Sequence, residues 1–98
     1  MASEETADAT ALLWALASEH RLQILGLLEH GERSVSDLAQ HIDLSQSALS
    51  QHLAPLRKAG IVSSHRQGVT IFYGVASHDA LALAKALSAV VAKRRGGD

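Results

Sequence analysis

The fold is decided by a stretch that reads SQSALSQHLAPLRKAG (residues 45–60) and runs directly into IVSSHRQGVTIFYGV (residues 61–75). Its first serine can cap a helix, and the three leucines that follow, spaced four and three residues apart, fall on one face of that helix. A glycine ends the helix, and alternating apolar residues then predict two strands, at 61–66 and 69–75, joined by a turn at Gln67–Gly68. The stretch therefore predicts an anchored helix followed by a β-hairpin.

The opposite face of this helix is small and polar. It carries Gln46, Ser47, Ser50 and Gln51, whose amides and hydroxyls can hydrogen-bond to base edges and phosphates. A helix that only covered a core would more often present Glu and Lys to solvent. Together with the cap residue Ser45, these side chains are our candidates for contacting a DNA groove.

Basic and polar side chains gather at the end of this helix and at the tip of the hairpin. Arg57 and Lys58 close the helix, where positive charge suits both the helix dipole and a phosphate. The hairpin candidates for contacting phosphates or the minor groove are His65, Arg66, Gln67 and Thr70. A hairpin that follows a groove helix is a wing, so the helix and the hairpin are expected to act on one duplex.

Apolar residues at spacings of three and four predict four further helices. We expect them at about 6–17, at 19–30, from a Ser34 cap to Ile42, and at 78–94. The third of these and the helix after Ser45 are short and joined by a tight turn, which is a helix-turn-helix. The predicted fold is therefore mainly α with a small β-hairpin, a winged helix-turn-helix. It forms a single domain over residues 1–98, with frayed ends at 1–5 and 95–98.

The first and last helices each carry an apolar stripe that the rest of the predicted fold leaves uncovered. A chain of 98 residues can build one modest core, and proteins of this size often gain stability by pairing. We therefore expect a two-fold homodimer built from both chain ends. Its predicted contact residues are Leu12, Leu13, Leu16, Leu83, Leu87, Val90 and Val91.

Charge is distributed unevenly along the chain, although the net charge is −1. Residues 1–45 carry eight acidic and two basic side chains, whereas residues 46–98 carry two acidic and seven basic ones. The basic half contains the polar helix and the hairpin, so a polyanion is the expected partner of that half. Charge alone leaves one alternative open, which is a solvated basic face without a partner.

The composition also excludes several kinds of site. The chain has no cysteine, which rules out disulfides, thiolate metal sites and thiol redox switches. No two of the six histidines are three or four residues apart, so a local metal clamp is excluded. A metal site assembled across helices or subunits, for example with His20 or His78, stays open. Because no phosphate loop or nucleophile motif is present, we predict neither an enzyme nor a bound cofactor.

Hydropathy argues against a membrane protein. No apolar run approaches the roughly 18 residues that a membrane span needs. The acidic start, MASEETAD, lacks the positive charge that begins a secretory signal. We therefore expect no membrane association and a cytoplasmic location.

Three motifs in a fixed order carry a resemblance to a known family. They are HRLQILGLL (20–28), ERSVSDLAQHIDLSQSALSQHLAPLRKAGIV (32–62) and RQGVTIFYGV (66–75). With these motifs the chain resembles the ArsR family of small dimeric winged-helix repressors, over nearly its whole length. The resemblance implies a transcriptional repressor that leaves its operator when a signal arrives. It also implies base contacts from the polar helix face described above and wing contacts from Arg66 and its neighbours.

The resemblance does not extend to the sensing sites of that family. The family's thiolate metal motif aligns with the segment ERSVSDL, where Ser34 and Ser36 occupy the cysteine positions. Its terminal-helix metal site needs an Asp-x-His pair and a distant His, but here Asp79 is followed by Leu81, and Ala92 stands at the distant position. Members that respond to sulfide or oxidants use a cysteine pair, which this chain lacks. The resemblance therefore implies no metal site of either kind and leaves the inducer unknown.

Two hypotheses of different class follow. The leading one is a homodimeric, sequence-specific DNA-binding regulator, in the first place a repressor, on a near-palindromic operator in double-stranded DNA. The helix at 46–58 would enter the major groove, and the wing at 65–70 would contact the backbone or the minor groove. The alternative is a helical adaptor whose acidic N-terminal half binds a protein partner without DNA.

Overall fold

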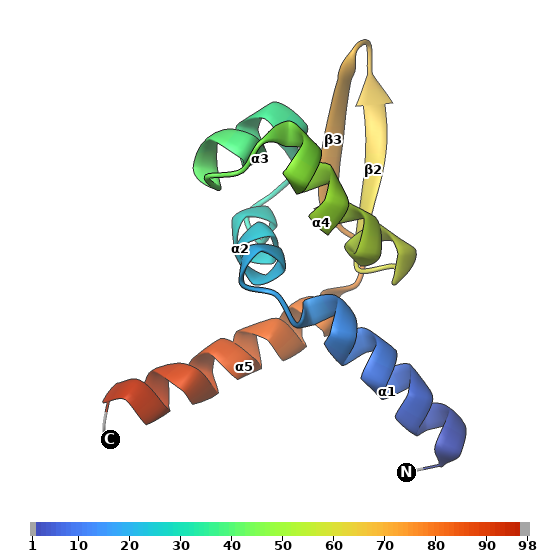
Figure 1. Ribbon diagram of the computed structural model, residues 1–98, viewed down its shortest axis with the longest axis vertical. Helices are drawn as coiled ribbons and strands as arrows, with labels where there is room; N and C mark the ends of the chain where they lie inside the picture. Colours follow the sequence, from blue (N-terminus) through green and yellow to red (C-terminus); the bar gives the residue numbers. More distant parts are fainter. Residues whose placement is uncertain (1, 97–98) are drawn as a thin grey trace.

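The chain folds as a winged helix-turn-helix (Figure 1). The computed structural model describes residues 2–96. Over that range the elements are α1 (Ser3–Leu16), α2 (Glu19–Leu28), β1 (Arg33–Ser34), α3 (Val35–His41), α4 (Gln46–Lys58), β2 (Val62–Gln67), β3 (Thr70–Val75) and α5 (His78–Gly96). The predicted mainly α fold with a small hairpin is therefore confirmed.

Serine caps start four of the helices. Each cap hydroxyl accepts a hydrogen bond from the backbone N–H three residues further along the chain, at 3.0–3.3 Å. The four capping residues are Ser18, Ser34, Ser45 and Ser77. These bonds satisfy backbone donors that the first turn of each helix would otherwise leave without a partner.

The helix ends differ from the predicted ones by a few residues. α1 begins at Ser3, α2 already ends at Leu28, and α5 continues to Gly96. Residues 3–5 and 95–96 are thus helical, whereas residues 1, 97 and 98 lie outside the described range. The expected fraying of both chain ends stays a prediction.

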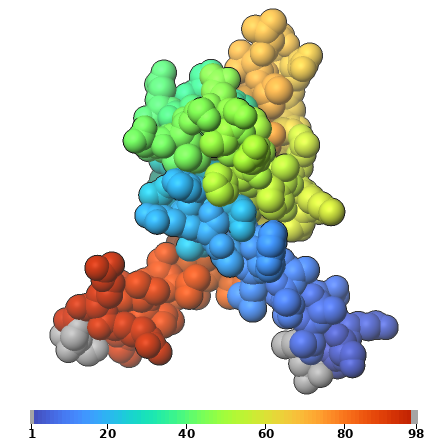
Figure 2. All heavy atoms as spheres, viewed as in Figure 1, coloured from blue at the N-terminus to red at the C-terminus, as the bar shows by residue number. Residues whose placement is uncertain are grey.

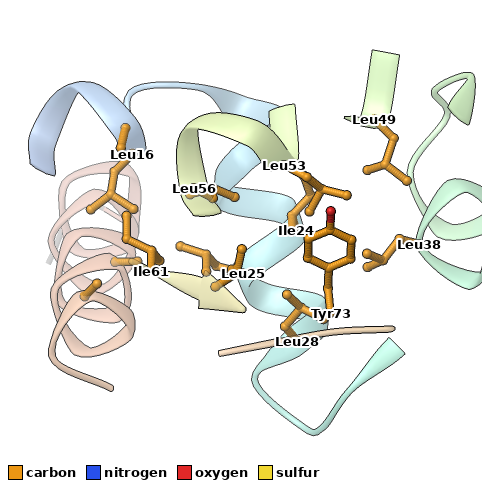
Figure 3. Packing of buried hydrophobic residues seen from close by; sticks show 14 of the residues in the cluster. Leu16, Ile24, Leu25, Leu28, Leu38, Leu49, Leu53, Leu56, Ile61 and Tyr73 are labelled. Atoms are coloured by element: carbon orange, nitrogen blue, oxygen red, sulfur yellow. The ribbon is translucent and has the colours of Figure 1, made fainter. Parts of the chain in front are cut away.

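The core forms where α2, α3 and α4 meet the base of the hairpin. Its largest fully buried side chains are Ile24, Leu25, Leu28, Leu38, Leu49, Leu53, Leu56, Ile61 and Val62. Tyr73 of β3 joins them from the sheet (Figure 3). Because burying one such side chain is worth roughly 1.5–3 kcal/mol, the leucines of α2 and α4 hold α4 in a defined position.

The sheet contains a strand that the sequence did not predict. Its order is β1-β3-β2, all antiparallel, and β1 pairs Arg33 with Tyr73. A strand of two residues is too short to show an alternating pattern. Through β1 the wing is attached to the segment that leads into α3.

The turn of the hairpin lies one residue further along than predicted. Gln67 pairs with Thr70, so the turn residues are Gly68 and Val69 rather than Gln67 and Gly68. Gly68 has a φ of +63°, which glycine adopts without strain. Val69 continues the apolar alternation of β3 in the sequence, and the alternation alone predicted it as a strand residue. In the structure its side chain is 99% exposed at the wing tip.

α1 and α5 leave the body at the end opposite the wing tip (Figure 1). The space-filling view shows them as two separate arms (Figure 2). Among its described residues α5 buries Ala80 and Ala84 only, and Lys85 Nζ lies 2.8 Å from Glu29 Oε2 of α2. The bond to Lys85 lowers the pKa of Glu29. The rest of α5 is exposed from Lys85 onward, including its apolar row.

Candidate nucleic-acid interface

α4 presents the polar face that the sequence predicts. Its leucines at positions 49, 53 and 56 are at most 1% exposed and anchor the helix from behind. On the other side, Gln46, Ser47, Ser50 and Gln51 are all exposed, as is the cap residue Ser45. These side chains lie in the first two turns of α4, where the positive end of the helix dipole favours a phosphate.

α3 is tied to the body of the protein through one arginine. The Arg33 guanidinium donates from Nη1 to Asp37 Oδ2 at 2.7 Å and from Nε to the Leu27 carbonyl at 3.1 Å. These bonds join the first turn of α3 to the last turn of α2. The helix-turn-helix formed by α3 and α4 is therefore held against the core by these bonds.

Strand pairing divides the wing residues between two faces. Arg66 pairs with Ile71, and Ile71 lines a hollow shared with α4, so Arg66 lies on the face toward α4. His65 pairs with Phe72 on the opposite face. Its Nε2 atom lies 3.0 Å from the carboxylate oxygens of Glu32, and its ring stacks on Phe72 with centroids 5.5 Å apart. The structure therefore separates His65 from the polar face of α4.

α3, α4 and the wing border a hollow of about 390 Å³. Its lining residues are Val35, Ser36, Gln46, Ser50, Val69, Thr70, Ile71 and Tyr73. The structure thus brings Gln46 and Ser50 together with Thr70 at the wing tip, whereas Gln67 pairs with Thr70 but does not line the hollow. Ser36 and Val69 are not among the contacts predicted from the sequence. Two sequence features could have indicated them. Ser36 is a polar residue in the first turn of α3, and Val69 is an apolar residue next to a turn glycine.

Arg57 and Lys58 lie at the other end of α4. The helix spans 13 residues, which at about 1.5 Å per residue places them roughly 18 Å from Gln46. Both side chains are exposed near the base of the hairpin, and Lys58 lines a different hollow, against α1. The structure does not bring these two residues together with the other predicted contacts.

His52 supports α4 from its inner side. Its Nδ1 atom is buried without a hydrogen-bond partner among the described residues. Its ring packs against His20 of α2, with centroids 5.1 Å apart. Burial lowers the pKa of His52, and the nearby His20 and Arg21 lower it further. The lowered pKa favours the neutral imidazole, which packs against His20.

Other kinds of site find little support in the described residues. Over residues 2–96, no three His, Cys, Asp or Glu side chains are grouped so that they could hold a metal ion. Ser34, at one of the family's cysteine positions, uses its hydroxyl as the cap of α3. None of the described helices has the length and hydropathy to cross a bilayer.

The predicted dimer residues fall into two groups. Leu13, Leu83, Leu87, Val90 and Val91 are exposed large apolar side chains on the two arms. Leu12 is half-buried, and Leu16, at 3% exposure, belongs mainly to the core of its own chain. A hollow of about 230 Å³ between the arms is lined by Leu13, Leu16, Ala17, Leu83 and Leu87.

A helix-turn-helix with an outward polar helix, a β-hairpin beside it and two terminal helices defines the class of winged helix-turn-helix proteins. Residues 18–64 match the model of the family described as bacterial regulatory protein, arsR family. The chain belongs to this ArsR family.

Relatives extend the match to most of the chain. The chain is 45% identical over 84 residues to the transcriptional activator HlyU of Vibrio cholerae, which covers 86% of this chain and 78% of HlyU. A solved structure of HlyU from the same species, 43% identical, superposes with a TM-score of 0.83 and covers 91% of this chain and 97% of that chain. The chain is also 42% identical over 83 residues to the biofilm growth-associated repressor of Agrobacterium fabrum, covering 85% of this chain and 71% of the repressor.

A third relative shows the same architecture at greater distance. It is the solution structure of a homodimeric winged helix-turn-helix DNA-binding domain from Mycobacterium bovis. At 28% identity it superposes with a TM-score of 0.86 and covers 100% of this chain and 94% of that chain. The protein is thus a transcriptional regulator and not an enzyme, and these relatives give no support to an adaptor without DNA.

Proposed function

We propose that the protein is a homodimeric repressor that binds a near-palindromic operator through α4 and the wing. The observation that carries this proposal is the exposure of Gln46, Ser47, Ser50 and Gln51 on a helix whose opposite face is buried. Short amides and hydroxyls on a rigid helix are suited to reading base edges in the major groove. The wing tip lies beside the same end of α4, where it can reach the adjoining backbone.

The proposed contacts divide into two kinds. The exposed face of α4 reads bases, whereas Arg66, Gln67 and Thr70 of the wing hold phosphates or the edge of the minor groove. Arg57 and Lys58 lie too far from the N-terminal end of α4 to enter the same stretch of the DNA major groove. Any phosphates that they contact therefore lie in flanking DNA. His65, paired with Glu32 on the other face of the wing, has the weakest case among the predicted contacts.

The proposed dimer follows from the position of the apolar arms. α1 and α5 leave the body away from the wing tip (Figure 1), and we place the two-fold axis through these arms in the direction that turns both α4 helices toward one duplex. Two such helices meet half-sites about one helical turn apart, roughly 34–36 Å. The Mycobacterium bovis relative is homodimeric, which supports the pairing itself.

The direction of regulation and the place of action belong to the same proposal. The relatives include a protein named an activator and one named a repressor. We favour repression, because a dimer bound to a promoter blocks transcription from it without any contact to another protein. Promoter binding would take place in the cytoplasm, where bacterial DNA lies. A promoter–reporter fusion tests the direction: reporter output rises on deletion of a repressor gene and falls on deletion of an activator gene.

Binding of the purified protein to genomic fragments, followed by footprinting, tests the proposal directly. We expect a protected near-palindrome and an affinity that falls steeply with salt as phosphate counterions are released. Gln46→Ala should reduce discrimination between operator and scrambled duplex, whereas Gln23→Ala, an exposed glutamine on α2, should leave it unchanged. A stable dimer that shifts no fragment at low salt would contradict the proposal and favour the alternative, an adaptor that binds a protein partner.

A further inference from the structure

A second hollow lies between α1 and the C-terminal end of α4. Its volume is about 460 Å³, within the usual range for small-molecule pockets. Its lining residues are Ala11, Trp14, Ala15, Pro55, Lys58 and Ala59. It shares no residue with the hollow beside the wing, so it is a separate feature of the molecule.

The lining combines flat apolar walls with a single charge. Trp14, the only tryptophan of the chain, is 69% exposed, which leaves a large aromatic surface in water. The remaining walls are the ring of Pro55 and the methyl groups of three alanines. The one charged group is the ammonium of Lys58, which forms no ion pair with any residue between positions 2 and 96.

A second cation steadies this region. The Arg21 guanidinium donates to the carbonyls of Ala15 at 2.6 Å and Trp14 at 3.1 Å, and it lies 5.7 Å from the indole centroid. It therefore fixes the last turn of α1, from which Trp14 projects. It also adds positive potential beside the indole, which favours an anion in the hollow.

The proposed dimer face does not account for this hollow. At about 100° per residue, Ala11, Trp14 and Ala15 lie on one side of α1, nearly opposite to Leu13 and Leu16. Leu13 and Leu16 turn toward α5 instead, where they line the hollow between the arms. Pairing through α1 and α5 thus leaves Trp14 in need of another explanation.

We propose that this hollow binds a planar aromatic carboxylate. The ring would stack on the Trp14 indole against Pro55, and the carboxylate would accept a hydrogen bond from the Lys58 ammonium. Because the hollow joins α1 to the end of α4, a bound ligand would bias the position of the proposed groove helix. This regulatory consequence rests on the proposed function, whereas the binding itself does not.

Calorimetric titration of the full chain with 2-naphthoate tests the binding, with neutral 2-naphthamide as the probe that lacks the charge. We expect 2-naphthoate to bind more tightly than 2-naphthamide. Lys58→Met should weaken 2-naphthoate by roughly tenfold, the value of a hydrogen bond to a charged group, and leave 2-naphthamide unaffected. Arg57→Met is the matched control, since Arg57 is exposed at the same helix end but does not line the hollow. Trp14→Leu should weaken both probes.

Three results would overturn the inference. They are no heat of binding for 2-naphthoate, equal binding by the Lys58→Met variant, and a shift of Trp14 emission with protein concentration alone. The last result would mean that a second copy of the chain covers the indole. Operator binding is measured separately without probe. DNA binding without 2-naphthoate binding refutes this inference alone, and the reverse result refutes only the proposed function.

Discussion

The two ends of the molecule differ in whether their apolar side chains are buried or exposed. At the wing end, α4 buries three leucines completely and shows solvent a polar face. At the other end, α5 buries two alanines and leaves Leu83, Leu87, Val90 and Val91 in water. The wing end buries its apolar residues within one chain, whereas the apolar residues of the arms are exposed in the single chain. Under the proposed function, this difference puts pairing and DNA contact in separable parts of the protein.

The largest effect is expected where α4 rests on the core. Leu53→Ala removes a side chain that is 1% exposed, and such truncations cost about 2–5 kcal/mol. Against a total stability of roughly 5–15 kcal/mol, this loss weakens the whole fold. Urea unfolding followed by circular dichroism measures it. An unchanged midpoint would mean that α4 is not anchored as described.

The second effect should leave the fold intact and break the pairing. Leu87→Glu places a charge in the exposed apolar row, where central interface residues carry about 2 kcal/mol or more. We expect dimer dissociation to rise by roughly thirtyfold, with unchanged circular dichroism. Sedimentation velocity over a range of concentrations measures this, and Lys93→Glu, another exposed α5 position, gives the comparison. A dimer that survives Leu87→Glu would place the interface elsewhere.

The third effect separates the two faces of the wing. Arg66→Ala should weaken binding to every duplex by about tenfold and reduce the salt slope by about one. His65→Ala should change affinity less, because its imidazole is engaged by Glu32. Fluorescence anisotropy at several salt concentrations measures both, with Arg95→Ala as the control for a lost surface charge. Equal losses from Arg66→Ala and His65→Ala would contradict the assignment of faces.

The smallest effect concerns pH. The pKa of His52 is lowered from its ordinary value of 6.5 in the folded state, so the folded protein resists protonation there. The unfolded chain then binds more protons as pH falls below 6.5, and the free energy of unfolding declines. His52→Leu should flatten this decline, whereas His30→Leu, an exposed position, should not. Chemical unfolding at a series of pH values from 7.5 downward tests it, and parallel curves for wild type and His52→Leu would refute it.

Local patterns predicted much of this molecule, and non-local pairings account for most of what they missed. The caps at Ser34 and Ser45 and the polar face of α4 each depend on residues within one turn of helix, which a sequence displays directly. The pairing of His65 with Glu32 joins residues 33 positions apart, and no periodicity reveals it.

One further miss, and one separation that the sequence does not display, have equally physical causes. Val69 follows the alternation of β3, but the close pairing of Gln67 with Thr70 puts it in the turn. Arg57 and Lys58 stay predicted phosphate contacts, but the length of α4 places them at the far end of the helix from Gln46, a separation that their charge does not reveal. In both cases the residue type fits the pattern in the sequence, but the three-dimensional path of the chain determines where the residue lies.

The most direct test of the account compares two duplexes with two proteins. Anisotropy titrations at fixed salt use the footprinted operator and a scrambled duplex of equal length, with wild-type protein and the Gln46→Ala/Ser50→Ala variant. We expect the variant to lose about 1–3 kcal/mol of discrimination for each bidentate contact removed, while its affinity for the scrambled duplex stays the same. An unchanged ratio between the two duplexes would contradict the claim that the exposed face of α4 reads the operator.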